Sequence, residues 1–139
     1  MPDSAKTQPD VVSPSLLFRQ NAVVWGLCAV PFAVIAATLL FLQTAMLALG
    51  HFPRAMIDDP KITLPRHPIA YAQYEQFDEW GFLSVLVAIA ALIAGGVFVA
   101  HLRRMKWLYT GSGIVYVGTL ASFIAFLPLW LRIAYWVAD

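Results

Sequence analysis

Three long apolar runs, at residues 22–50, 81–102 and 107–138, constrain this chain more than any other feature. Each reaches the roughly 20 mainly apolar residues that a helix needs to cross the hydrocarbon layer of a bilayer. None shows the alternating pattern of a barrel strand, and backbone amides in lipid must bond within their own segment, so the runs predict α-helices. We therefore predict an all-α, polytopic membrane protein with three transmembrane helices.

The composition also favours a bilayer as the surroundings of this chain. Of its 139 residues, 60% are hydrophobic and 12% are charged, which falls outside the usual composition of soluble globular domains. The formal net charge is +1 and the basic residues form no stripe, so nucleic acid is set aside as a partner. We expect the partners to be the lipid bilayer and either other membrane protein subunits or further copies of the chain.

The polar segments define a tail and a connector. Residues 1–12 have the composition of a flexible N-terminal tail, followed by one transmembrane domain at 13–139. Ser13 before Pro14 predicts a helix start, because the serine oxygen can accept an amide hydrogen bond and proline at the first helical position loses no needed donor. Residues 51–80 form an extramembrane loop between the first two spans.

The second half of this loop has a helical pattern. From Pro68 onward, Ala70, Tyr74, Phe77 and Trp80 share one helical face, whereas the first half is punctuated by prolines that prevent a long helix. We therefore predict that the second span extends into the loop as a helix.

The short turn between the second and third spans predicts the orientation of the chain. Arg103, Arg104 and Lys106 lie in this turn, and such a density of basic residues on a short loop is typical of the cytoplasmic face. We expect a multi-pass protein of the inner (plasma) membrane, with its N terminus cytoplasmic and its C terminus and long loop periplasmic or extracellular.

Small residues recur at helical spacing on all three spans. Such stripes let helix backbones approach closely in lipid, so we expect helix packing through them, within the chain or between chains. The predicted packing residues are Gly26, Ala29, Ala33, Ser84, Ala88, Ala91, Gly95, Gly118 and Ser122. Gln43 lies on the same stripe of the first span and is predicted to form a hydrogen bond inside the bundle, to Ser84 or Ser122.

Few side chains are candidates for metal binding. His51 and His67 could meet in the long loop, but their spacing matches no ligand signature, so they are weak candidates and no metal is predicted. His51 and His101 fall at opposite ends of a span, separated by the ~30 Å hydrocarbon layer, and cannot hold one haem iron.

One ion pair is predicted at the outer ends of the second and third spans. Arg132 falls at the same predicted level as Asp78 and Glu79, and pairing would hold these ends together. The alternative is that Arg132 extends to lipid phosphate.

Function is predicted from what the helices lack as much as from what they contain. The chain has no recognisable catalytic or cofactor motif, so we expect no catalytic activity of its own and predict no cofactor. The leading hypothesis is an accessory or scaffolding subunit of a larger membrane complex.

Two alternatives stay open. In layout, three spans with a cytoplasmic N terminus are similar to the small membrane anchors of fumarate and succinate oxidoreductases, a resemblance of topology alone; it would imply a respiratory anchor beside haem or quinone. The other alternative is an oligomeric small transporter or channel, whose pathway would be lined by Gln43, Tyr116, Thr119 and Ser122.

Overall fold

The structure is a computed structural model that describes residues 13–138. It confirms the predicted all-α class: 87% of the described residues are helical, and three of the helices are long and apolar enough to cross a membrane. The predicted flexible tail, residues 1–12, lies outside the described residues. In chain order the elements are α1 (Pro14–Leu49), α2 (Pro60–Thr63), the 3-10 helix η1 (Leu64–Arg66), α3 (Pro68–Arg104) and α4 (Thr110–Ala138).

Helix ends follow local sequence signals. Helix α1 begins at Pro14, but the Ser13 hydroxyl lies 2.6 Å from the Ser15 hydroxyl and does not cap a backbone amide. The helix ends at Leu49 and is followed by the capping residue Gly50, which has a φ of 76°. Glycine is suited to this left-handed position because it has no Cβ to clash with the backbone. Helix α3 begins at Pro68, so the second span does extend into the loop.

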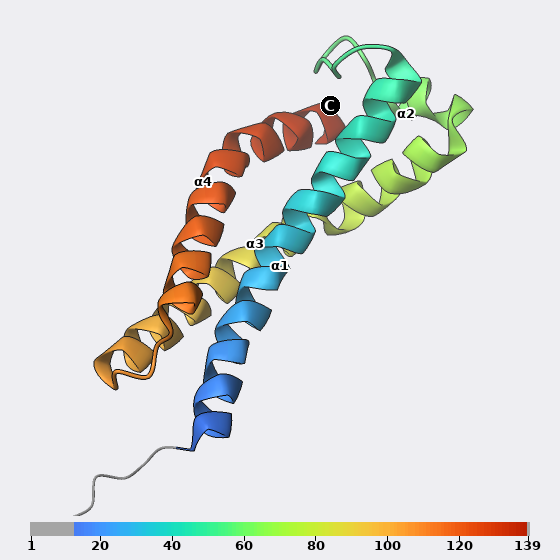
Figure 1. Cartoon of the computed structure of the whole chain (residues 1–139). Helices are drawn as coiled ribbons and strands as arrows, with labels where there is room; N and C mark the ends of the chain where they lie inside the picture. The colour runs from blue at the N-terminus through green and yellow to red at the C-terminus, as the bar shows by residue number, and fades with distance from the viewer. Residues whose placement is uncertain (1–12, 139) are drawn as a thin grey trace, which may run out of the picture.

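The long helices form a bundle in which each contacts the other two (Figure 1). The segment between α1 and α3 lies at one end, together with the C-terminal end of α4. The tight turn between α3 and α4 lies at the other end, beside the beginning of α1. We call these the connector end (residues 50–67) and the turn end (residues 105–109).

Three buried clusters follow one another along the bundle. At the connector end, Phe41, Leu64 and Trp136 pack together with residues of α3. The middle cluster joins α3 to α4 through Ala88 and Phe123, among others. The cluster at the turn end is built from Val24, Cys28 and Leu102. The connector therefore shares a core with the helices.

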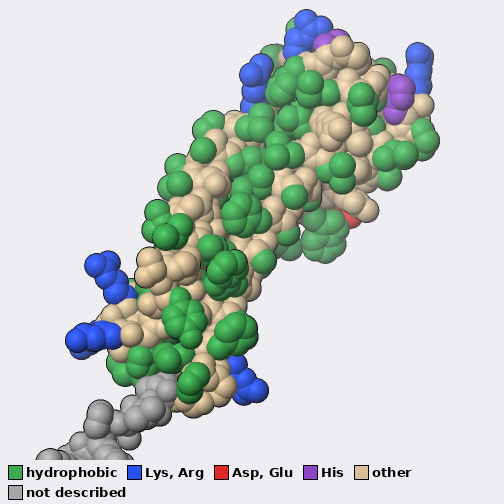
Figure 2. All heavy atoms as spheres, viewed as in Figure 1, with side chains coloured by type: hydrophobic (Ala, Val, Ile, Leu, Met, Phe, Trp, Pro, Cys, Tyr) green, Lys and Arg blue, Asp and Glu red, His purple; other side chains and the backbone are tan. Residues whose placement is uncertain are grey.

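The outer surface matches a membrane-spanning protein. Figure 2 shows Lys and Arg side chains gathered at the two ends, with hydrophobic side chains between them. Large apolar side chains such as Phe82, Val97 and Leu131 are at least 60% exposed, and a continuous apolar surface of this kind needs lipid around it. The cytoplasmic or external assignment of each end remains a prediction.

Candidate functional site

The predicted small residues of α3 are those that the bundle buries or half-buries: Ser84, Ala88, Ala91 and Gly95. A Cβ added at Gly95 would lie 3.2 Å from the Tyr116 ring, and one added at Gly96 would lie 2.6 Å from the Tyr116 hydroxyl oxygen. That hydroxyl donates a hydrogen bond of 3.0 Å to the Leu92 carbonyl oxygen. The glycine pair thus forms a notch that holds a tyrosine of α4.

The predicted small residues of α1 and α4 have a different environment. All five are exposed: Gly26, Ala29, Ala33, Gly118 and Ser122. Helix α1 instead turns larger side chains inward, among them Val24 and Phe41. A Cβ added at Gly26 or Gly118 would meet no atom within 4 Å, so the chain's own packing does not need glycine at either position.

Three of these exposed small residues line a groove between α1 and α4. Its volume is about 600 Å³, and its lining includes Ala29, Gly118 and Ser122 together with the exposed Phe32. The buried Thr119 also lines it, but the Thr119 hydroxyl donates its hydrogen bond to a carbonyl of its own helix. We call this the α1/α4 groove.

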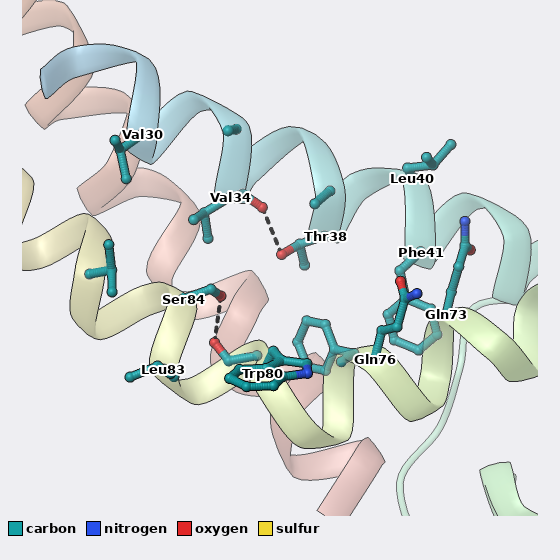
Figure 3. A pocket seen from close by; sticks show the side chains of 15 residues that line it. Val30, Val34, Thr38, Leu40, Phe41, Gln73, Gln76, Trp80, Leu83 and Ser84 are labelled. Carbon is teal, nitrogen blue, oxygen red and sulfur yellow. Dashed lines mark hydrogen bonds between the residues drawn. The ribbon is translucent and has the colours of Figure 1, made fainter. Parts of the chain in front are cut away.

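A second groove separates α1 from α3 over their halves nearer the connector end (Figure 3). It has a volume of about 650 Å³ and mostly apolar walls. Leu40 of α1 and Leu83 of α3 line it and are exposed, so the groove opens on the apolar outer surface. We call this the α1/α3 groove.

The polar groups of the α1/α3 groove differ along its length. Within it, the Thr38 and Ser84 hydroxyls donate to carbonyls of their own helices, at 2.9 and 2.7 Å (Figure 3). At its connector end, the Gln73 side-chain oxygen accepts a hydrogen bond from the Thr44 hydroxyl. The Gln76 amide forms no hydrogen bond with any residue in the described range 13–138, so its donors and acceptor are available to a ligand.

A charged cavity of about 590 Å³ lies on another face of α3 and has one lining residue, Gln76, in common with the α1/α3 groove. Three carboxylates, of Glu75, Asp78 and Glu79, line the cavity together with Lys61. Tyr74 also lines it, in the part of α3 that precedes the apolar run. Burial, and then the nearby Asp78 carboxylate, raise the pKa of the Tyr74 phenol above its ordinary value, so the phenol stays neutral at physiological pH.

A buried asparagine, which the sequence analysis missed, holds the turn end. The Asn21 side chain donates to the Trp107 carbonyl at 3.0 Å and accepts from the Tyr109 amide at 3.0 Å. One turn further along α1, the Trp25 indole donates to the Ser112 hydroxyl at 3.2 Å. The available sequence signal was the position of Asn21, a polar residue at the beginning of an apolar run. A side-chain amide buried there needs hydrogen-bond partners.

The two histidines proposed as weak metal candidates have different environments. His51 lies 3.6 Å from the Asp58 carboxylate, which also lies 3.8 Å from Arg54. His67 is the residue that precedes α3. Within residues 13–138, no group of three or more His, Cys, Asp or Glu side chains is placed to hold a metal ion.

The structure places Arg132 away from the predicted ion pair. Its guanidinium lies 4.8 Å from the centre of the Phe52 ring. Within the described residues, the ion pairs are those of Asp58 with His51 and Arg54, so Arg132 forms none with Asp78 or Glu79. The physical reason is that the connector folds over the end of α4 and supplies an aromatic face to the cation.

The polar residues of the predicted transport pathway lie apart within one copy. Gln43 is exposed in a cavity at the connector end and forms no hydrogen bond to Ser84 or Ser122 in the part of the chain that is described. Thr119 and Ser122 line the α1/α4 groove, whereas the Tyr116 hydroxyl is bonded to α3.

Two surfaces are therefore left over by the packing of the chain on itself. The α1/α4 groove offers small side chains to an apolar neighbour, and the α1/α3 groove is a mostly apolar channel with the Gln73 and Gln76 amides at its connector end. Comparison of the chain with protein-family models, with curated proteins and with solved structures finds no match.

Proposed function

We propose that this protein is an accessory or scaffolding subunit of a larger membrane complex, and that its α1/α4 groove receives a transmembrane helix of another subunit. One observation supports the proposal above all: Ala29, Gly118 and Ser122 line one exposed groove that no part of residues 13–138 fills. Transmembrane helices associate through small side chains because these let backbones come close enough for extensive van der Waals contact.

The shape of the groove favours a helix as the occupant. Gly118 and Ser122 are four residues apart and follow the same face of α4, while Ala29 and Phe32 supply the α1 wall. A helix seated between these walls would bury surface that otherwise faces lipid. Each long helix already contacts the other two, so the groove is available without any rearrangement of the core.

Leucine substitution in the groove tests the proposal. Gly118→Leu places a large side chain where nothing in the chain lies within 4 Å of a Cβ, so the subunit should fold while the groove is blocked. We expect the wild-type chain to co-purify with another membrane protein in mild detergent, and Gly118→Leu to lose that association. The matched control is Ala94→Leu, which changes an exposed position of α3 outside both grooves.

Two outcomes would contradict the proposal. The first is recovery of the wild-type chain as a monomer without any partner. The second is retention of the same partner by Gly118→Leu at the level of the Ala94→Leu control. Gly95→Leu is unsuitable for this test, because Gly95 contacts Tyr116 inside the chain and its substitution would disturb folding.

A further inference from the structure

The two ends of the bundle differ in charge. Every carboxylate side chain of residues 13–138 falls between positions 58 and 79, where it accompanies the cations of the connector end. Figure 2 shows the turn end with Lys and Arg side chains and with no Asp or Glu on the visible face. The exposed cations of this end, which we call the basic surface, are Arg19, Arg103, Arg104 and Lys106.

Distance leaves these cations without compensation by the described carboxylates. Glu79 and Arg103 both belong to α3, and at ~1.5 Å per residue they are separated by ~36 Å along the helix. Charges on a protein surface are screened within ~8 Å at physiological ionic strength. The basic surface is therefore free to attract anions from outside the described chain.

The turn between α3 and α4 is held so that its cations face outward. Leu102 is fully buried and Trp107 packs in the same cluster, whereas residues 103–106 between them are exposed. The Trp107 amide donates to the Leu102 carbonyl at 2.9 Å, and the Asn21 side chain of α1 donates to the Trp107 carbonyl. A fixed backbone lowers the entropy that is lost when the side chains bind a ligand.

The basic surface lies at the edge of the apolar outer surface. Val97 of α3 is 69% exposed and lies ~9 Å along the helix from Arg103. Arginine and lysine side chains near the end of a membrane-spanning helix extend their charged groups toward the headgroups. Tyr109, beside the cations, is 46% exposed, and tyrosine favours the same level. The cations are thus within reach of lipid phosphates.

The arrangement of the cations favours lipid headgroups over an acidic protein segment. Arg19 belongs to α1 and the other cations to the end of α3 and the turn, so they are spread over two segments. Several phosphates side by side in one leaflet can pair with cations spread in this way. A zwitterionic lipid carries an ammonium group that offsets its phosphate, whereas an anionic lipid keeps a net negative charge for the cations to bind.

We propose that the basic surface binds the headgroup phosphates of anionic glycerophospholipids in the leaflet at the turn end. The guanidinium groups of Arg103 and Arg104 donate hydrogen bonds to phosphate oxygens, and Lys106 and Arg19 add their charges beside them. This surface is separate from the α1/α4 groove and does not depend on the identity of a partner subunit.

Lipid retention by the full-length chain tests this proposal. The protein is placed in nanodiscs of equimolar phosphatidylethanolamine and phosphatidylglycerol and is then released for native mass spectrometry. We expect the wild type to retain phosphatidylglycerol over phosphatidylethanolamine by about fivefold or more, the effect expected from a single basic residue beside anionic lipid. A high concentration of ammonium acetate in the nanodisc sample should lower this preference, because salt screens exposed charges.

Matched double substitutions locate the effect. Arg103→Gln with Arg104→Gln removes two cations from the basic surface and should lower the preference at least about fivefold. Lys61→Gln with Arg66→Gln removes the same charge from exposed positions of the connector end and should leave it unchanged. Lys106 has a φ of 59°, a conformation that suits glycine, so Lys106→Gly should lower the preference without a loss of thermal stability.

The proposal is refuted by equal retention of both phospholipids by the wild type, or by equal losses of preference in the two double variants. Polyglutamate is a second probe: its binding by the wild type, without any preference for phosphatidylglycerol, would assign the basic surface to an acidic protein segment instead. Circular dichroism of each variant separates a loss of binding from a loss of folding. None of these variants alters the α1/α4 groove, so failure here and failure of the proposed subunit role are distinguished.

Discussion

The indole nitrogen of Trp136 donates a hydrogen bond to the backbone carbonyl oxygen of Asp58, and this contact joins the last turns of α4 to the connector. The Asp58 carboxylate in turn accepts a hydrogen bond of 2.9 Å from the Arg54 amide. Trp136 is 1% exposed and stacks on Phe41 of α1, with ring centroids 5.9 Å apart. The connector is thus held against α4 at the point where α4 packs on α1.

Trp136→Ala should destabilise the fold more than any substitution of an exposed aromatic residue nearby. It removes a buried ring and leaves the Asp58 carbonyl without its partner, and large-to-small changes of this kind cost about 3–5 kcal/mol. Thermal unfolding in detergent measures the effect. Tyr135→Ala is the control, since Tyr135 is 61% exposed on the same helix; equal unfolding midpoints for the two variants would refute the role given to Trp136.

Asn21→Leu should loosen the turn between α3 and α4. It removes the hydrogen bonds to Trp107 and Tyr109, at a cost of about 1–3 kcal/mol for the buried groups left unpaired. Hydrogen exchange should show faster exchange of the Tyr109 amide, while amides in the middle of α3 are unaffected. Asn21→Asp keeps the acceptor for Tyr109 and should protect that amide better than leucine does.

The notch that receives Tyr116 can be tested by a pair of substitutions. Gly96→Ala places a Cβ 2.6 Å from the Tyr116 hydroxyl, so the ring must move and lose its hydrogen bond to Leu92, at about 1–2 kcal/mol. In a Tyr116→Phe background the clashing oxygen is absent, and the same change should cost much less. Additive effects on unfolding would argue against the contact.

A glycine with open surroundings is the control for this pair. Gly118→Ala also replaces a helical glycine of the bundle, but its Cβ would meet nothing within 4 Å. Alanine has the higher helix propensity, so this change should leave stability equal or slightly raised. Destabilisation by Gly118→Ala as large as that by Gly96→Ala would mean that helix context, and not Tyr116, determines the cost.

The helices were predictable from sequence because their signals are local. Apolar length identified the spans, and Pro14 and Pro68 marked two helix starts. The packing faces were harder to predict, since a small side chain suits either a neighbour in the same chain or one outside it. Of the predicted packing residues, those on α3 lie inside the bundle and those on α1 and α4 are exposed. On α3, Tyr116 of α4 occupies the space beside Gly95 and Gly96.

The contacts that close the two ends join distant parts of the chain. Asn21 reaches a residue 86 positions away, and Trp136 reaches one 78 positions away. No local periodicity encodes such pairs. The expected pairing of Arg132 with Asp78 or Glu79 was wrong for the same reason: it assumed that equal depth implies contact, whereas the folded connector places Phe52 beside the guanidinium.

The opposite placement of the connector and the turn between α3 and α4 predicts the result of cysteine labelling. Cys28 is buried and is the one cysteine of the chain, so Cys28→Ala gives a background for Ala55→Cys and for Met105→Cys. In sealed vesicles of one orientation, a membrane-impermeant thiol reagent should reach one of these positions from outside and the other only after the vesicles are opened. The basic turn at Arg103 and Arg104 predicts that position 105 is the cytoplasmic one. Labelling of both positions from the same side would mean that α3 does not cross the bilayer, and the proposed helix-binding role of the α1/α4 groove would then lose its membrane setting.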